Sequence, residues 1–183
     1  MSDIIERILR TFDQRGDLAY GGEAVTQRQH ALQAATLAAA EQADPRLVAA
    51  ALLHDIGHIL DAGELPAGTD SDLDDAHEER AYGWLLRHFG PPVADPVRLH
   101  VAAKRYLCTV DPAYAGKLSP TSHKSYLDQG GPMNAEERAA FEAEPHCEES
   151  LRLRRWDDLA KDPSMATLRI PAFRPALEQA LLA

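Results

Sequence analysis

The sequence predicts an all-α fold. Helix signals follow one another along the chain, whereas neither sustained apolar–polar alternation nor an Asn-Gly hairpin turn is present. The chain has 183 residues, of which 45% are hydrophobic. That length is enough for one well-buried domain and hardly enough for two. We therefore expect a single helical domain with no linker, repeat or low-complexity segment.

Capping residues locate the expected helices. An amphipathic helix is expected over residues 2–13. Thr26 and Gln29 form a capping-box pattern that opens an Ala-rich helix to about residue 42. Asp44 and Pro45 start the next helix, which is expected to run to about residue 60. A polar loop should follow over 61–74, and the remaining helices are expected at about 75–88, 95–108, 121–128 (within a long loop, 109–133), 134–143, 146–161 and from 175.

The overall charge excludes some classes of partner. The formal net charge is -10 and the pI is about 5.2, so nucleic acids and anionic membranes are not expected as main partners. An anionic small substrate would need a locally positive pocket.

The two cysteines, Cys108 and Cys147, make no disulfide framework and are expected to be reduced thiols of a cytoplasmic protein. The first residues contain no long apolar core, and the sequence has no apolar run of about 18 residues, so neither a signal peptide nor a transmembrane helix is expected.

The stretch LLHDIGHIL, residues 52–60, is the most informative motif. It has His54, Asp55 and His58 in an otherwise apolar helix, and His54 and His58 would share one helix face. Burying a carboxylate among imidazoles costs several kcal/mol unless a cation is present. A divalent metal ion removes that cost, and this donor set suits iron, zinc, manganese or nickel. A lone buried histidine is more often a hydrogen-bonded core residue, so the prediction depends on further inward-facing residues on other helices: His30, His77, His100 and either Asp157 or Asp158.

The order H…HD…H…H…D on successive helices resembles the HD-domain superfamily, and LLHDIGH is close to its most specific motif. The resemblance covers residues 20 to about 161 and implies a single HD domain over 1–183, built as a helical bundle around a dinuclear metal site. It also implies that Asp55 bridges the two metals. The implied ligands are His30, His54, Asp55 and Asp157 for one metal, and His77 and His100 for the other. Asp157 is preferred to Asp158 because family members place this aspartate four residues before the lysine that is Lys161 here.

Three local patterns are similar to the branch of mixed-valent diiron oxygenases that cleave the carbon–phosphorus bond of 2-amino-1-hydroxyethylphosphonate. Tyr20 and Glu23 precede His30 by ten and seven residues, Lys104 follows His100 by one helical turn, and Ser122 and Gln129 lie in SPTSHKSYLDQGGPM. Taken singly, each pattern has an ordinary explanation: packing, a solvated charge or a turn. Together they imply that Tyr20 covers the open iron position and that Glu23 meets the substrate amine. They also imply that the phosphonate is held by Lys104, His58, Ser122 and Gln129.

This resemblance implies an Fe-dependent dioxygenase of organophosphonate catabolism. Its cofactor would be two iron ions, Fe(II)/Fe(III), and its substrates O2 and a small zwitterionic organophosphonate. Cleavage of 1-hydroxy-2-(amino or trimethylammonio)ethylphosphonate would give inorganic phosphate and glycine or glycine betaine, with Tyr20 and His58 as the catalytic residues. Glu23 favours a primary ammonium, whereas a trimethylammonium prefers aromatic faces. The alternatives are a dinuclear phosphohydrolase acting on a nucleotide or phosphomonoester, and a non-catalytic HD-fold module.

Overall fold

The computed structural model describes residues 2–60 and 77–182, with side chains for 3–60 and 81–182. These residues are mostly helical and contain no β-strand, only an isolated bridge between Ala19 and Thr26. The predicted all-α class is therefore confirmed. The helices are α1 (Ser2–Arg15), α2 (Gln27–Ala40), α3 (Pro45–Leu53), η1 (Ile56–His58), α4 (His77–Phe89), α5 (Pro91–Val110), α6 (Pro112–Ala115), α7 (Pro120–Asp128), α8 (Ala135–Glu142), α9 (Cys147–Leu159), η2 (Ile170–Phe173) and α10 (Arg174–Ala180).

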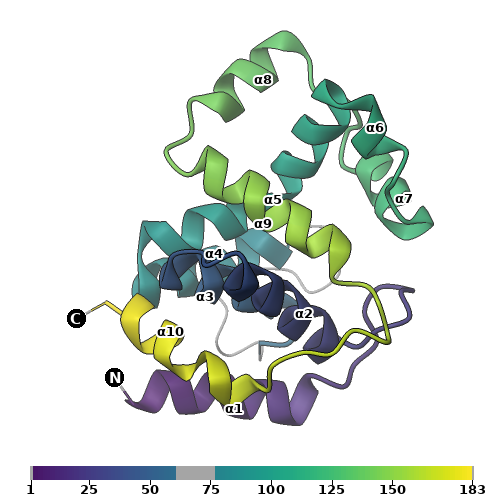
Figure 1. Cartoon of the computed structure of the whole chain (residues 1–183). Coiled ribbons are helices and arrows are strands. Elements are labelled where there is room, and N and C mark those ends of the chain that lie inside the picture. The colour runs from purple at the N-terminus through teal and green to yellow at the C-terminus, as the bar shows by residue number, and fades with distance from the viewer. Residues whose placement is uncertain (1, 61–76, 183) are drawn as a thin grey trace.

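Five helices make the centre of the molecule. α5 packs against α3, α4 and α9, and α2 packs against α3 and α9. α10 covers α3, and the N-terminal α1 lies beside α10 (Figure 1). The main core includes Phe12, Leu52, Leu85 and Trp156, each at most 1% exposed. α2 and α3 are neighbours in the sequence, whereas α5 and α9 come from later parts of the chain, and the inward faces of all four helices meet in the middle of the bundle.

The second half of α5 extends beyond this bundle to α6, α7 and α8, which form a separate group (Figure 1). Two smaller apolar clusters fasten that group. Leu99, Met133 and Phe141 belong to one, and Tyr114 and Tyr126 to the other. The predicted long loop over 109–133 therefore contains α6 as well as the expected α7. Cys108 and Cys147 are both buried and free.

The predicted caps are largely confirmed. Thr26 Oγ1 accepts from the Gln29 N–H at 3.2 Å, and Gln29 Oε1 accepts from the Thr26 N–H at 2.9 Å. Asn134 and Glu137 form the same reciprocal pair at the start of α8. The predicted start of a helix near Asp95 is wrong, because α5 begins at Pro91. Gly90, with φ 74°, separates α4 from α5 and puts Pro91 at the first helical position, where the missing N–H costs nothing.

The polar loop expected at 61–74 and the start of the helix expected at 75 lie outside the described residues. Within the described part of the chain, no helix combines the length and the apolar character that a membrane crossing requires.

Candidate metal centre and substrate cavity

The junction between α3 and η1 positions the first residues of the site. α3 ends at Leu53, and Asp55 adopts φ −106° and ψ 14°, close to the bridge region where many active-site residues are found. The prediction of one α-helix to residue 60, with His54 and His58 on a shared face, is therefore wrong. His54 is fully buried at the end of α3, whereas His58 is half-buried on the 3₁₀ turn.

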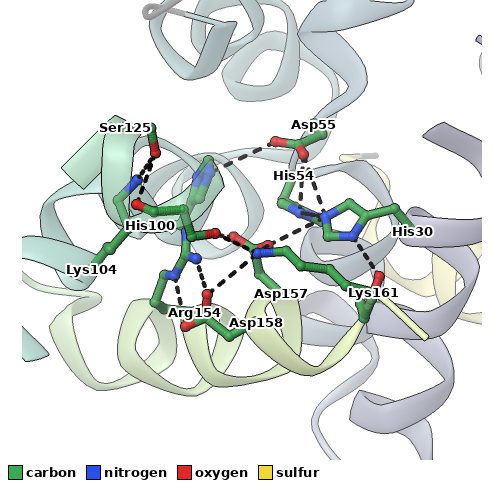
Figure 2. Close-up of polar contacts among 12 residues, drawn as sticks. His30, His54, Asp55, His100, Lys104, Ser125, Arg154, Asp157, Asp158 and Lys161 are labelled. Carbon is green, nitrogen blue, oxygen red and sulfur yellow. Dashed lines mark hydrogen bonds and ion pairs between the residues drawn. The ribbon is translucent and has the colours of Figure 1, made fainter. Parts of the chain in front are cut away.

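Three imidazoles from α2, α3 and α5 direct their Nε2 atoms into one buried space (Figure 2). His30, His54 and His100 are each at most 2% exposed. Their Nδ1 atoms donate to the carbonyl oxygens of Ala160, Ala51 and Val97, at 2.8, 2.9 and 2.6 Å respectively. Since Nδ1 carries the proton, each Nε2 is available as a ligand atom, and the ring orientation is held by the backbone.

The Asp55 carboxylate lies between these imidazoles. Its Oδ2 is 3.5 Å from Nε2 of His30 and 3.4 Å from Nε2 of His54, while its Oδ1 is 3.7 Å from Nε2 of His100. Asp157 approaches from α9, with its Oδ1 3.3 Å from Nε2 of His30. The two oxygens of Asp55 therefore face two different groups of imidazoles, which is the geometry a bridging carboxylate needs.

The donor set fits a divalent metal. The Nε2 atoms of His30 and His54 are 2.9 Å apart, and the buried Oδ1 of Asp157 accepts no hydrogen bond from the described residues. Burial alone would lower the pKa of His30, but the adjoining carboxylates of Asp157 and Asp55 outweigh it and raise the pKa to about 9. In the metal-free cluster, His30 therefore carries a second proton and lies as a cation between the carboxylates of Asp55 and Asp157. A metal ion would replace that proton and supply the positive charge.

The remaining predicted ligands have different positions. His77 is the first residue of α4, but its side chain lies outside the described residues, so its place in the cluster stays a prediction. Asp158 points away from the imidazoles: it pairs with Arg154 and accepts a hydrogen bond from Tyr114. Asp157 is therefore the aspartate of α9 that lies beside His30 (Figure 2).

A cavity of about 430 Å³ opens next to this cluster. Asp55, His100 and Asp157 form part of its wall, and all six residues predicted to bind substrate line it: Tyr20, Glu23, His58, Lys104, Ser122 and Gln129. The structure thus brings together residues from α5, α7, η1 and the segment before α2. Gln129 also has a buried Oε1 that accepts no hydrogen bond within the described part of the chain.

Among the described residues, three cationic side chains line the cavity near the cluster, and of these only Lys104 was predicted from the sequence to bind substrate. Lys104 is 3% exposed and donates to Ser125 Oγ at 2.7 Å; burial lowers the pKa of this lysine to about 8. Lys161 donates to Ser122 Oγ at 2.7 Å, and the buried Arg154 pairs with Asp157 Oδ2 at 2.6 Å. Because Arg154 precedes Asp157 by three residues on α9, the two share a helix face, and this spacing was the available signal.

The segment before α2 supplies the other wall. The Ala19–Thr26 bridge closes a tight turn in which Gly21 and Gly22 have φ of 45° and 84°. The Tyr20 ring stacks on the His30 imidazole, with 3.8 Å between ring centroids. Burial, and then the charges of Asp157 and Asp55, raise the pKa of Tyr20 well above its usual value, so the phenol keeps its proton at neutral pH. Tyr20 is therefore a neutral group in contact with the candidate metal centre.

Comparison with known proteins agrees with this geometry. The family model of the HD domain matches residues 28–162. The chain belongs to the HD-domain family. It is 41% identical over 178 residues to a 1-hydroxy-2-(trimethylamino)ethylphosphonate dioxygenase (glycine-betaine-forming) of Leisingera caerulea, covering 97% of this chain and 90% of that protein. It is also 39% identical over 178 residues to a hydroxymethylphosphonate dioxygenase of Gimesia maris, covering 96% and 89%. The predicted resemblance to the phosphonate-cleaving branch of the HD-domain family is therefore confirmed.

Proposed function

We propose that this HD-domain protein is an iron-dependent dioxygenase that cleaves the carbon–phosphorus bond of a small 1-hydroxyphosphonate. The observation that carries the proposal is the shared cavity: a buried His/Asp cluster adjoins Lys104, Arg154 and Lys161 in a chain of net charge -10. Phosphonate is a dianion, so an otherwise acidic protein must gather cations where it binds one. The 41% and 39% identity to phosphonate dioxygenases supports the same assignment.

His30, His54, Asp55 and Asp157 would hold one iron, and Asp55, His77 and His100 the other. When bound, such a pair supplies O2 activation and a Lewis acid for the substrate's oxygen atoms. The overall reaction balances, since one 1-hydroxyphosphonate and one O2 give one carboxylic acid and one inorganic phosphate.

The side chains around the cluster would orient the substrate. Lys104 binds the phosphonate through a charge-assisted hydrogen bond, with Ser122, Gln129 and His58 as further contacts. Tyr20, held flat against His30, covers the metal-facing side of the cavity until the substrate hydroxyl takes its place. Glu23 lies on the turn before α2 and meets a cationic nitrogen at the far end of the substrate.

The nitrogen end is where the names of the two relatives differ. One names a trimethylamino group and the other a hydroxymethyl compound without nitrogen. In this chain, Glu23 favours a primary ammonium because an ammonium can donate hydrogen bonds and a trimethylammonium cannot. Among the described lining residues, Tyr20 is the sole phenyl-type ring, and its face is already stacked on His30. We therefore place 2-amino-1-hydroxyethylphosphonate first among candidate substrates.

The test measures O2 consumption and phosphate release together. Protein reconstituted with iron is offered 2-amino-1-hydroxyethylphosphonate, its trimethylammonio analogue and hydroxymethylphosphonate, with and without O2. We expect equal amounts of O2 consumed and phosphate released, about two iron ions per chain, and a mixed-valent signal in electron paramagnetic resonance. Release of phosphate from a nucleotide or phosphomonoester without O2, and none from the phosphonates, would instead identify a phosphohydrolase.

A further inference from the structure

We infer that Ser119 is a specificity-determining residue: it positions Glu23 and thereby sets the preference for substrates that carry a cationic nitrogen. The inference rests on the proposed function and concerns a residue that does not itself line the cavity. It follows from the contacts of one helix, α7, which joins the two ends of the substrate cavity.

The turn before α2 holds the backbone of Glu23, whose N–H donates to the Tyr20 carbonyl at 2.7 Å, but no hydrogen bond from the described residues of that turn reaches its carboxylate. Glu23 follows Gly21 and Gly22, both with positive φ, and its carboxylate stands at the end of a flexible side chain that is only half-buried. Among the described residues, the one hydrogen bond to this carboxylate comes from Ser119, whose Oγ is 2.5 Å from Glu23 Oε1. Without this hydrogen bond, the Glu23 side chain would be free to rotate, and a substrate that orders it would lose binding free energy to the entropy cost.

Ser119 is itself fixed by α7. It is the N-cap residue, and its Oγ accepts from the Ser122 N–H at 3.1 Å. The Ser119 hydroxyl therefore accepts a hydrogen bond from the α7 backbone and donates one to Glu23, so it acts both as acceptor and as donor. Glu23 Oε1 is occupied by this bond, so Oε2 is the oxygen that can receive a substrate cation.

The same helix holds the anionic end. Ser122 Oγ accepts from Lys161, and Ser125 Oγ accepts from Lys104, both at 2.7 Å. Ser119, Ser122 and Ser125 recur every three residues and so follow one face of α7. Adjacent serines are about 4.5 Å apart along the axis, because a helix rises about 1.5 Å per residue. This spacing suits a compound in which two carbons separate the nitrogen from the phosphorus.

The experiment compares two substrates in iron-loaded protein. Ser119→Ala and Ser119→Gly should raise KM for 2-amino-1-hydroxyethylphosphonate by about tenfold, the loss expected for one hydrogen bond to a charged group, with kcat little changed. KM for hydroxymethylphosphonate, which has no nitrogen, should change by less than about twofold on the same grounds. Ser119→Thr keeps the hydroxyl and should restore the wild-type KM.

Two controls separate positioning from helix stability. Glycine is nearly as good an N-cap as serine whereas alanine is not, so a capping effect would appear in Ser119→Ala and be much smaller in Ser119→Gly. Asn134→Ala removes the N-cap of α8, which does not line the cavity, and should leave both KM values unchanged. The inference would be overturned if the Ser119 variants changed KM equally for both substrates or for neither. It would also be overturned if the wild-type protein turned over hydroxymethylphosphonate but not 2-amino-1-hydroxyethylphosphonate. No O2-dependent turnover of any phosphonate would instead overturn the proposed function.

Discussion

Replacing Arg154 with methionine should destabilise the metal-free protein by about 3–5 kcal/mol, because it removes one partner of a buried charge network. The guanidinium is 4% exposed and lies 2.6 Å from Oδ2 of Asp157, which is 1% exposed, and it also pairs with Asp158. Methionine has a similar length but no charge, so Asp157 Oδ2 would lose its cationic partner and stay buried, with only His30 and Lys161 near Oδ1 among the described residues. For a chain of 183 residues, 1 kcal/mol corresponds to about 2–4 °C in Tm, which predicts a fall of roughly 6–20 °C.

The loss should depend on pH in a defined direction. Burial would raise the pKa of Asp157, but Arg154, followed by Lys161 and His30, holds it well below the usual value. A carboxylate with a depressed folded-state pKa adds stability above its unfolded pKa, and this contribution disappears as pH falls through the folded pKa. The difference between wild type and Arg154→Met should therefore be largest near pH 7 and should shrink below about pH 4.

The assay is urea unfolding of the chelator-treated protein, followed by circular dichroism at several pH values. Arg155→Met is the matched control, because Arg155 is the exposed neighbour on α9 and should cost less than about 0.5 kcal/mol. Arg154→Lys keeps a charge but loses the two-pronged geometry, so an intermediate loss is expected. A loss below about 1 kcal/mol for Arg154→Met, or equal losses at both arginines, would refute the view that Arg154 compensates the Asp157 charge.

Three further outcomes are expected. Since burial lowers the pKa of Lys104 to about 8, phosphonate affinity measured by titration calorimetry should fall as pH rises through 8; Lys104→Met should remove this pH step while metal analysis still finds the iron. His54→Ala and His100→Ala should each lower iron content from about two ions per chain to about one, because each removes a ligand of a single site, whereas Asp55→Ala should remove nearly all of it; loss of both ions in His54→Ala and in His100→Ala would contradict the two-site assignment. Gln129→Leu removes the amide N–H that can donate to a phosphonate oxygen, so it should raise KM for phosphonates by about tenfold; Tm should not fall, because the buried Oε1 accepts no hydrogen bond from the described residues, and an unchanged KM would exclude Gln129 from the anion site.

The sequence predicted most of the helices because their boundaries are local. Thr26 with Gln29, and Asn134 with Glu137, satisfy the first amide groups of their own helices, so the capping pattern is enough to find them. The prediction of helix boundaries was less reliable where two local start signals lay close together. The Asp-Pro pair at 95–96 has the form of a helix start, yet Gly90 and Pro91 provide an earlier one and Pro96 lies inside α5.

By itself, the sequence determined the fold class, the HD-domain family and the candidate ligands, because the order H…HD…H…H…D on successive helices resembles the motif of that family. Only the tertiary structure decided how those donors meet. The end of α3 at Leu53 separates His54 from His58, and Arg154 takes one oxygen of Asp157 so that the other faces His30. Such contacts join segments that are far apart in the chain. Which side chains meet there depends on burial, charge and distance in space, and these cannot be predicted from a local sequence pattern.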